Sequence, residues 1–232
     1  MSYKAQLRQQ RYNTVINRKS KKQELNLGES LFKVIETLQS DGEVVIHHEG
    51  SIALNKIINK LEEMYSDVQF ARALKTSSMR PDGGILYVVD NKDNLYPILI
   101  AEVKNQGTND LRAREGKPKQ ARGNAIERLG KNVIGFRTFL LNESIFPFVV
   151  FGYGCDFEDG SSILDRVATI NMFGQLNVTN LHNLGPNGIF NRGSFYFREQ
   201  KWTEEEMFNI MLDIATRSIH YYYSKYGKTI FE

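Results

Sequence analysis

The feature that most constrains this chain is a hairpin pattern between residues 81 and 104, which reads PDGGILYVVDNKDNLYPILIAEVK. Two apolar, β-branched runs are separated by the polar tetrapeptide at residues 91–94, whose composition is typical of a turn. If Asp90 pairs with Leu95 across a four-residue loop, each residue i faces residue 185 − i. The pattern therefore predicts two adjacent antiparallel strands.

Three ionisable side chains are expected to meet at the open end of this hairpin. Side chains alternate between the faces of a strand, so Glu102 and Lys104 share one face while Val103 points into the core. A one-residue bulge, which Gly83 and Gly84 would permit, turns Asp82 onto the same face. Two carboxylates and one ammonium then converge at a strand end. The alternative is an edge hairpin whose polar residues are merely solvated.

Two carboxylates beside a lysine form a set that can act on a phosphodiester. Mg²⁺ prefers oxygen ligands, keeps several waters and accepts further oxygens from a substrate phosphate. It would neutralise developing charge and lower the pKa of a bound water. Lys104 would orient or deprotonate that water, or stabilise the charged transition state. Asp82 and Glu102 are the candidate metal ligands.

A second cluster of polar residues stands at the start of a predicted helix. Apolar residues recur at three- and four-residue spacing from residue 124 to about residue 142, namely Ile126, Leu129, Val133, Phe136, Phe139 and Leu140. The loop and first turn hold Arg122, Asn124, Glu127 and Arg128, where backbone N–H groups are free to meet anions or base edges. Arginine suits guanine and asparagine suits adenine. The alternative is an Asn124 helix cap followed by solvated charges.

Together these motifs resemble the EcoRI-type branch of type II restriction endonucleases, within the PD-(D/E)xK nuclease superfamily. The resemblance rests on the blocks at residues 81–85, 101–104, 106–107 and 123–128. It implies that Asp82, Glu102 and Lys104 form the catalytic set. It implies DNA contacts by Arg80, Lys117, Arg122, Asn124, Ala125, Glu127, Arg128 and Arg166. Among these, Asn124, Glu127 and Arg128 would read an inner AATT and Arg80 would contact a phosphate.

The outer base pair of the expected site depends on residue 122. Arg122 stands where enzymes that cut GAATTC have a small residue, and the string at residues 115–124 looks more like the relatives that cut CAATTG. An arginine that the family has three residues before Arg166 is replaced here by Ile163. The resemblance therefore favours CAATTG, with GAATTC and AATT as alternatives.

The distribution of charge suits a polyphosphate partner. The formal net charge is only +3, but residues 1–22 carry seven Lys or Arg side chains and no acid, and residues 104–131 carry eight against three acids. Such basic patches favour DNA. We expect residues 1–22 to form a basic N-terminal arm along the duplex, although a solubilising tail would have the same composition.

The length predicts a single domain spanning residues 1–232. The resemblance implies that it is a restriction-endonuclease domain of the α/β class, with a central mixed β-sheet flanked by helices. One cysteine excludes an internal disulfide and a cysteine-rich zinc site. We expect a cytoplasmic protein without a membrane partner, because no secretion signal or membrane-length apolar run is present. Local patterns predict a helix at 29–38, a strand at 43–48, a helix from Ser51 to Tyr65, a strand at 146–152 and a capping box at 203–206.

The sequence thus predicts a Mg²⁺-dependent type II restriction endonuclease that cuts double-stranded DNA at a palindrome with an AATT core. Protein two-fold symmetry matching a palindrome implies a homodimer, and a cognate DNA methyltransferase would protect the host. Two other functions stay open. A structure-selective repair or junction nuclease would keep the catalytic set without the base-reading residues, and a non-catalytic DNA-binding module would keep neither activity nor metal.

Overall fold

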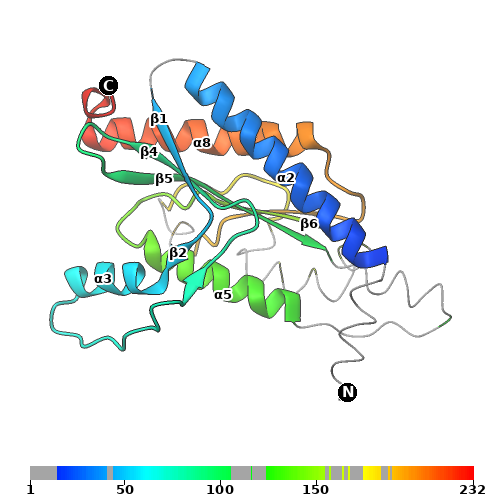
Figure 1. Cartoon of the computed structure of the whole chain (residues 1–232), viewed down its shortest axis with the longest axis horizontal. Coiled ribbons are helices and arrows are strands. Elements are labelled where there is room, and N and C mark those ends of the chain that lie inside the picture. Colours follow the sequence, from blue (N-terminus) through cyan, green and yellow to red (C-terminus); the bar gives the residue numbers. More distant parts are fainter. Residues whose placement is uncertain are drawn as a thin grey trace.

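A five-stranded mixed sheet forms the centre of the molecule (Figure 1). The computed structural model describes residues 15–40, 44–105, 116, 124–154, 157, 164, 167, 175–183, 188 and 190–232, with the backbone alone for 15–21 and 124–128. The strands are β1 (Val45–Glu49), β4 (Ile85–Val89), β5 (Leu95–Asn105), β6 (Phe148–Tyr153) and β7 (Ser194–Arg198), in the spatial order β1-β4-β5-β6-β7. The pairs β1–β4 and β4–β5 are antiparallel, whereas β5–β6 and β6–β7 are parallel.

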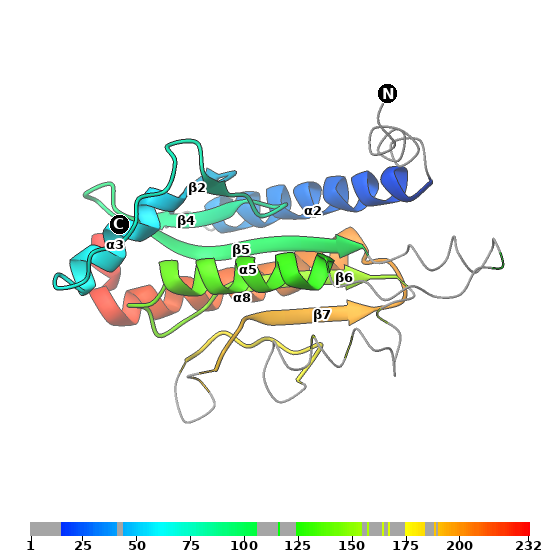
Figure 2. The same cartoon turned by 90° about the horizontal axis from the view of Figure 1, so that it is seen from below.

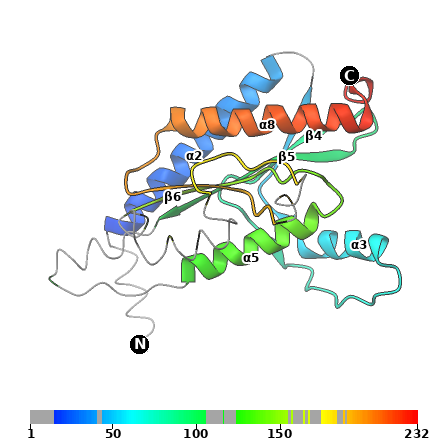
Figure 3. The same ribbon diagram turned by 180° about the vertical axis from the view of Figure 1, so that it is seen from behind.

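Helices cover both faces of this sheet, which confirms the expected α/β class. One face is covered by α2 (Val15–Ser40) and α8 (Glu204–Tyr226), and the other by α3 (Leu54–Met64) and α5 (Asn124–Phe139) (Figures 2 and 3). A short 3-10 helix, η2 (Lys228–Ile230), follows α8. Because both faces are covered, β5 and β6 are apolar almost throughout.

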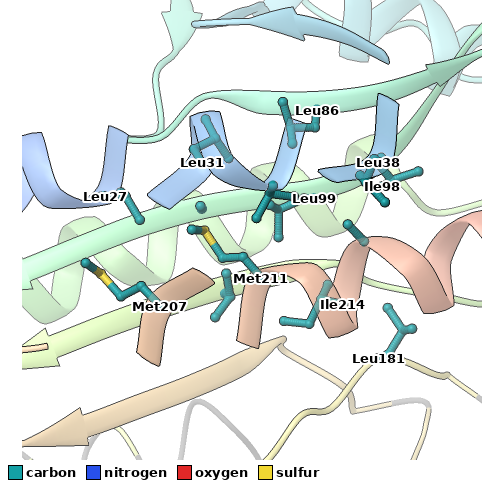
Figure 4. Packing of buried hydrophobic residues seen from close by; sticks show 14 of the residues in the cluster. Leu27, Leu31, Leu38, Leu86, Ile98, Leu99, Leu181, Met207, Met211 and Ile214 are labelled. Atoms are coloured by element: carbon teal, nitrogen blue, oxygen red, sulfur yellow. The ribbon is translucent and has the colours of Figure 1, made fainter. Parts of the chain in front are cut away.

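The larger apolar cluster lies between the sheet and the helices α2 and α8 (Figure 4). Both helices turn residues at three- and four-residue spacing toward the strands, among them Leu27, Leu31, Leu38, Met207, Met211 and Ile214. From the sheet they meet Leu86, Ile98 and Leu99. Each buried side chain of this size contributes about 1.5–3 kcal/mol. This packing therefore holds β5, which carries two of the predicted catalytic residues.

The last helix begins as its sequence predicts. The Thr203 hydroxyl accepts a hydrogen bond from the Glu206 backbone N–H, and the Glu206 carboxylate accepts one from the Thr203 N–H. This reciprocal capping box satisfies two N–H groups that lack helical partners. The preceding Trp202 is buried and donates its indole N–H to the Gly152 carbonyl, so the helix start is tied to β6.

The turn between β4 and β5 is closed by Asp90. Its carboxylate accepts hydrogen bonds from the backbone N–H of Lys92 and Asn94, the Asn94 amide and the Tyr96 hydroxyl. Desolvation acts to raise the pKa of Asp90, but these donors outweigh it and lower the pKa to about 2. Asp93 takes a left-handed conformation with φ 62°. Asp90 is thus part of the turn, and Val89 rather than Asp90 pairs with Leu95.

The hairpin register follows the expected relation only in the half nearer the open end. At the turn, residue i pairs with 184 − i, and a shift between Leu86 and Tyr87 restores 185 − i for the pairs Leu86–Leu99 and Ile85–Ile100. The sequence predicts an irregularity only at Gly83 and Gly84, whereas β5 also contains one extra residue between its pairs with Leu86 and Tyr87. This extra residue compensates for the one-residue shift at the turn, so Asp82 lies beside Val103 as predicted.

Two helix boundaries differ from the local sequence patterns. α2 begins at Val15, well before residue 29. Residues 18–25 are mostly good helix formers, and Leu27 continues the buried face of the helix toward its N-terminus. The last eight residues of the expected N-terminal arm are therefore helical. Ser51 does not cap α3: Ile52 and Ala53 form β2, which pairs with β3 (Ser78–Met79), and the helix starts at Leu54. No helix among the described residues has the length and apolarity needed to cross a bilayer.

Candidate active site

Asp82 lies in a tight turn that leads into β4. The Gly84 N–H donates to the Pro81 carbonyl at 3.0 Å, and the Gly83 N–H donates to the Ala101 carbonyl of β5 at 2.9 Å. Gly84 has φ +74°, and a Cβ there would lie 2.3 Å from Nε2 of His48. The turn therefore requires glycine at position 84. One Asp82 oxygen accepts the Val103 N–H at 3.2 Å, which holds the carboxylate against β5.

Glu102 and Lys104 lie on one face of β5, as strand alternation predicts. Val103 between them is buried in the cluster beneath α2 and α8, whereas Glu102 and Lys104 face the α5 side. The Glu102 side chain is 2% exposed, Lys104 20% and Asp82 29%. The Glu102 carboxylate is thus buried, whereas the Lys104 ammonium and the Asp82 carboxylate are partly exposed to solvent.

The structure brings the three predicted catalytic side chains together. The Lys104 ammonium lies 3.1 Å from Oδ2 of Asp82 and forms an ion pair with Oε1 of Glu102. Burial acts to lower the pKa of Lys104, but the two carboxylates outweigh it and raise that pKa, so the side chain is a cation at neutral pH. Burial raises the pKa of Glu102, opposed by the Lys104 charge and by hydrogen bonds from Lys104 and Asn132.

Asn132 of α5 is part of this site, and the sequence interpretation missed it. Its side-chain amide donates to both Glu102 oxygens, at 2.8 Å to Oε1 and 2.7 Å to Oε2. The sequence does contain an indication of this role. Around the axis of a helix, position 132 lies between Leu129 and Phe139 and therefore within the apolar stripe. A polar residue in a stripe that faces a sheet indicates a polar partner on that sheet.

The donor set is of the type that binds hard divalent cations such as Mg²⁺. Asp82 and Glu102 supply two carboxylates on one side of the sheet, and Mg²⁺ is usually held by one or two carboxylates, waters and substrate phosphate oxygens. Within the described part of the chain, no group of three or more His, Cys, Asp or Glu side chains could hold a metal ion. Those residues therefore provide no zinc-type site, and substrate oxygens would have to complete the coordination.

The predicted DNA-reading residues that the structure describes lie around the same end of the sheet. β5, α5 and β6 form a strand–helix–strand unit, so α5 begins near the end where β5 finishes, and α2 also begins at that end (Figures 1 and 2). The backbones of Asn124, Ala125, Glu127 and Arg128 form the first two turns of α5. Arg80 is exposed two residues before Asp82, and its Nε donates to the Ser78 hydroxyl at 3.0 Å. Lys117, Arg122 and Arg166 lie outside the described residues.

Comparison with known proteins shows that the amino-acid sequence matches a known family. The family model described as "Restriction endonuclease EcoRI" matches residues 9–229. The type II restriction enzyme RsrI of Cereibacter sphaeroides is 32% identical over 203 residues, covering 73% of each chain. The type II restriction enzyme EcoRI of Escherichia coli is 27% identical over 249 aligned positions, covering 92% of this chain and 88% of its own.

Proposed function

Because the chain belongs to the EcoRI family of type II restriction endonucleases, we propose that it hydrolyses phosphodiester bonds of double-stranded DNA at Asp82, Glu102 and Lys104. One observation carries the assignment of these residues. A single ammonium lies beside two carboxylates, one buried and one partly exposed, where the central strand ends. Positioned charges of this kind are what phosphoryl transfer requires.

Each residue has a distinct part in the reaction. Asp82 and Glu102 would hold Mg²⁺, which when bound neutralises negative charge on the phosphate and makes a coordinated water more acidic. Asp82 presents its carboxylate from the turn and Glu102 from the strand, so substrate can approach from the Asp82 side. Lys104 would donate to the attacking water or to a phosphate oxygen, because its ammonium is more accessible than Glu102.

We propose that the start of α5 and the loop before it recognise the DNA bases. Asn124, Ala125, Glu127 and Arg128 would contact an inner AATT, and Arg122 would contact the outer guanine of CAATTG. Bidentate arginine–guanine and asparagine–adenine contacts each discriminate by about 1–3 kcal/mol. Arg80, Lys117 and Arg166 would add DNA contacts, with Arg80 at a phosphate. GAATTC and AATT are the competing sites.

We further propose that two copies act as a homodimer. A palindrome presents the same sequence on both strands, so a two-fold symmetric dimer places one active site on each strand. A DNA methyltransferase with the same specificity would protect the host genome. It would be a functional partner, with no contact between the two proteins required.

The test is cleavage of supercoiled plasmid and genomic DNA by the purified protein with Mg²⁺, followed by mapping of the ends. Asp82→Ala, Glu102→Ala and Lys104→Ala should each reduce the rate at least about a hundredfold. Lys33→Ala is the matched control, since Lys33 forms an exposed ion pair with Glu204 at 3.3 Å on the opposite face of the sheet.

Two outcomes would contradict the proposal. Cleavage by Glu102→Ala at nearly the wild-type rate would exclude the catalytic set. Preference for branched DNA without any preferred sequence would indicate a junction nuclease that uses the same three residues.

A further inference from the structure

The contact between Asn132 and Glu102 joins the middle of α5 to the buried carboxylate of the active site. One amide nitrogen lies 2.8 Å and 2.7 Å from the two oxygens of Glu102. A nitrogen nearly equidistant from both oxygens restrains the rotation of the carboxylate plane as well as its position. The contact spans 30 residues of sequence. It therefore depends on the packing of helix against sheet.

The two carboxylates of the site are supported in different ways. Asp82 is held by the Val103 N–H and by Lys104. Glu102 is held by Asn132 and by the same Lys104. If Lys104 turns toward water or phosphate during the reaction, Asp82 keeps a backbone donor. Glu102 then keeps the Asn132 amide, its other donor among the described residues.

A neutral donor suits this position better than a second cation. An amide satisfies the hydrogen-bonding needs of a buried carboxylate without cancelling its charge, so the carboxylate keeps its attraction for a divalent cation. An arginine or lysine in its place would compete with that cation. Groups that orient a metal-binding side chain in this manner typically change metal affinity or activity by about 10–100-fold when removed.

We propose that Asn132 is a positioning residue that holds the Glu102 carboxylate in the orientation needed to bind Mg²⁺. The proposal rests on the proposed function, because it takes Glu102 as a metal ligand. Asn132 acts through Glu102 and need not touch DNA. Its loss should therefore weaken metal binding and leave metal-free binding of specific DNA unchanged.

The experiment compares Asn132→Ala and Asn132→Leu with Thr138→Val in the full-length protein. Leucine keeps the branched shape and the number of side-chain heavy atoms of asparagine without a donor, so it separates hydrogen bonding from packing. Thr138 lies on the same helix and donates to the Ile134 carbonyl of that helix, which makes it a matched loss of one polar side chain. Thermal unfolding and metal-free DNA binding first establish that each variant is folded.

The readouts are calorimetric titration of Ca²⁺ into the protein–DNA complex and the Mg²⁺ concentration that gives half the maximal single-turnover rate. Both Asn132 variants should weaken Ca²⁺ binding and raise that Mg²⁺ concentration about 10–100-fold, with DNA binding unchanged within about twofold. Thr138→Val should behave as wild type. Adding Asn132→Ala to Glu102→Ala should cause no further loss of Ca²⁺ affinity, because the amide acts through that carboxylate.

Wild-type metal dependence in both Asn132 variants would overturn this inference. So would recovery by leucine but not alanine, since that pattern indicates a packing role. Failure of the proposed function looks different, because Glu102→Ala would then still cut DNA and bind Ca²⁺ normally.

Discussion

The Lys104 ammonium lies 3.1 Å from Oδ2 of Asp82, although the two residues are 22 positions apart and reach the site from different sides of a hairpin. The same ammonium pairs with Glu102. Lys104 thus compensates the charge of two carboxylates when no metal is bound. A divalent cation and Lys104 therefore compete for the same negative charge.

Lys104→Ala should lose cleavage but retain binding of divalent metal. Removing one partner of a buried ion pair costs up to about 3–5 kcal/mol, because it leaves a buried charge without a counter-ion. A bound cation can replace that counter-ion, so Ca²⁺ should raise the melting temperature of Lys104→Ala more than that of wild type. Melting curves with and without Ca²⁺ check this. An equal shift in both proteins would show that the ion does not bind beside residue 104.

Gly84→Ala should distort the turn that presents Asp82. The left-handed backbone costs alanine about 1–2 kcal/mol, and the new Cβ would lie 2.3 Å from Nε2 of His48 and 2.7 Å from the Glu49 carbonyl. We expect lower stability and a large loss of cleavage rate. Gly227→Ala is the control: Gly227 has φ +91° but no atom within 4 Å of the added Cβ, and it lies at the end of α8.

Both glycine variants should lose stability, but only Gly84→Ala should lose cleavage rate. Gly227→Ala should lose stability through its own positive-φ backbone and keep its cleavage rate per folded molecule. Equal rates for both variants would mean that the Gly84 turn does not position Asp82.

The Arg198–Glu206 pair should make part of the stability depend on pH. Hydrogen bonds from Arg198 lower the pKa of Glu206 from 4.5 to about 2. The folded-state pKa lies below the ordinary value, so the contribution is complete above about pH 4.5 and is lost as the pH falls toward about 2. The difference in unfolding free energy between wild type and Glu206→Gln should shrink over that range.

Urea denaturation at pH 7, 4 and 2.5 measures this difference, and glutamine retains the capping box with Thr203. Asp213→Asn removes only a surface pair with Arg217 and should change stability by less than about 0.5 kcal/mol at neutral pH. A difference for Glu206→Gln that is independent of pH would exclude the charge of Glu206 as its source.

Deleting residues 1–14 tests the proposed DNA-binding arm without cutting into α2, which begins at Val15. If this segment lies along the duplex, specific and non-specific binding should weaken about equally. The slope of log affinity against log salt should fall by roughly 0.9 for each DNA phosphate that the segment neutralises in the intact protein. Binding titrations at several salt concentrations give the slope, and an unchanged slope would mean that these residues do not touch DNA.

Arg122→Ala should relax the choice of the outer base pair while AATT stays required. One bidentate arginine–guanine contact is worth about 1–3 kcal/mol, or roughly ten- to hundredfold in discrimination. Cleavage rates on the four palindromes of the form N-AATT-N′ check it, with Asn124→Ala as the comparison that should lose nearly all specific binding. A strong wild-type preference for GAATTC would rule out the proposed role of Arg122.

Local sequence patterns are sufficient to specify the features that depend on near neighbours. Strand alternation places Glu102 and Lys104 on one face of β5, and helical spacing predicts the start of α5 at Asn124. The capping box of α8 is encoded by two residues three positions apart. Each of these is a local geometric rule, so the order of residue types is sufficient to predict it.

Other features of the fold depend on contacts between distant segments and arise only in the tertiary structure. Ile52 and Ala53 form β2 because Ser78 and Met79 lie beside them, which overrides the helix cap expected at Ser51. The register shift in β5 and the hydrogen bonds from Asn132 to Glu102 likewise arise only when the elements pack. Local composition does not specify which helix covers which strand. The convergence of Asp82, Glu102 and Lys104 was therefore readable from the sequence, whereas the partner of Asn132 on the sheet became visible only in the fold.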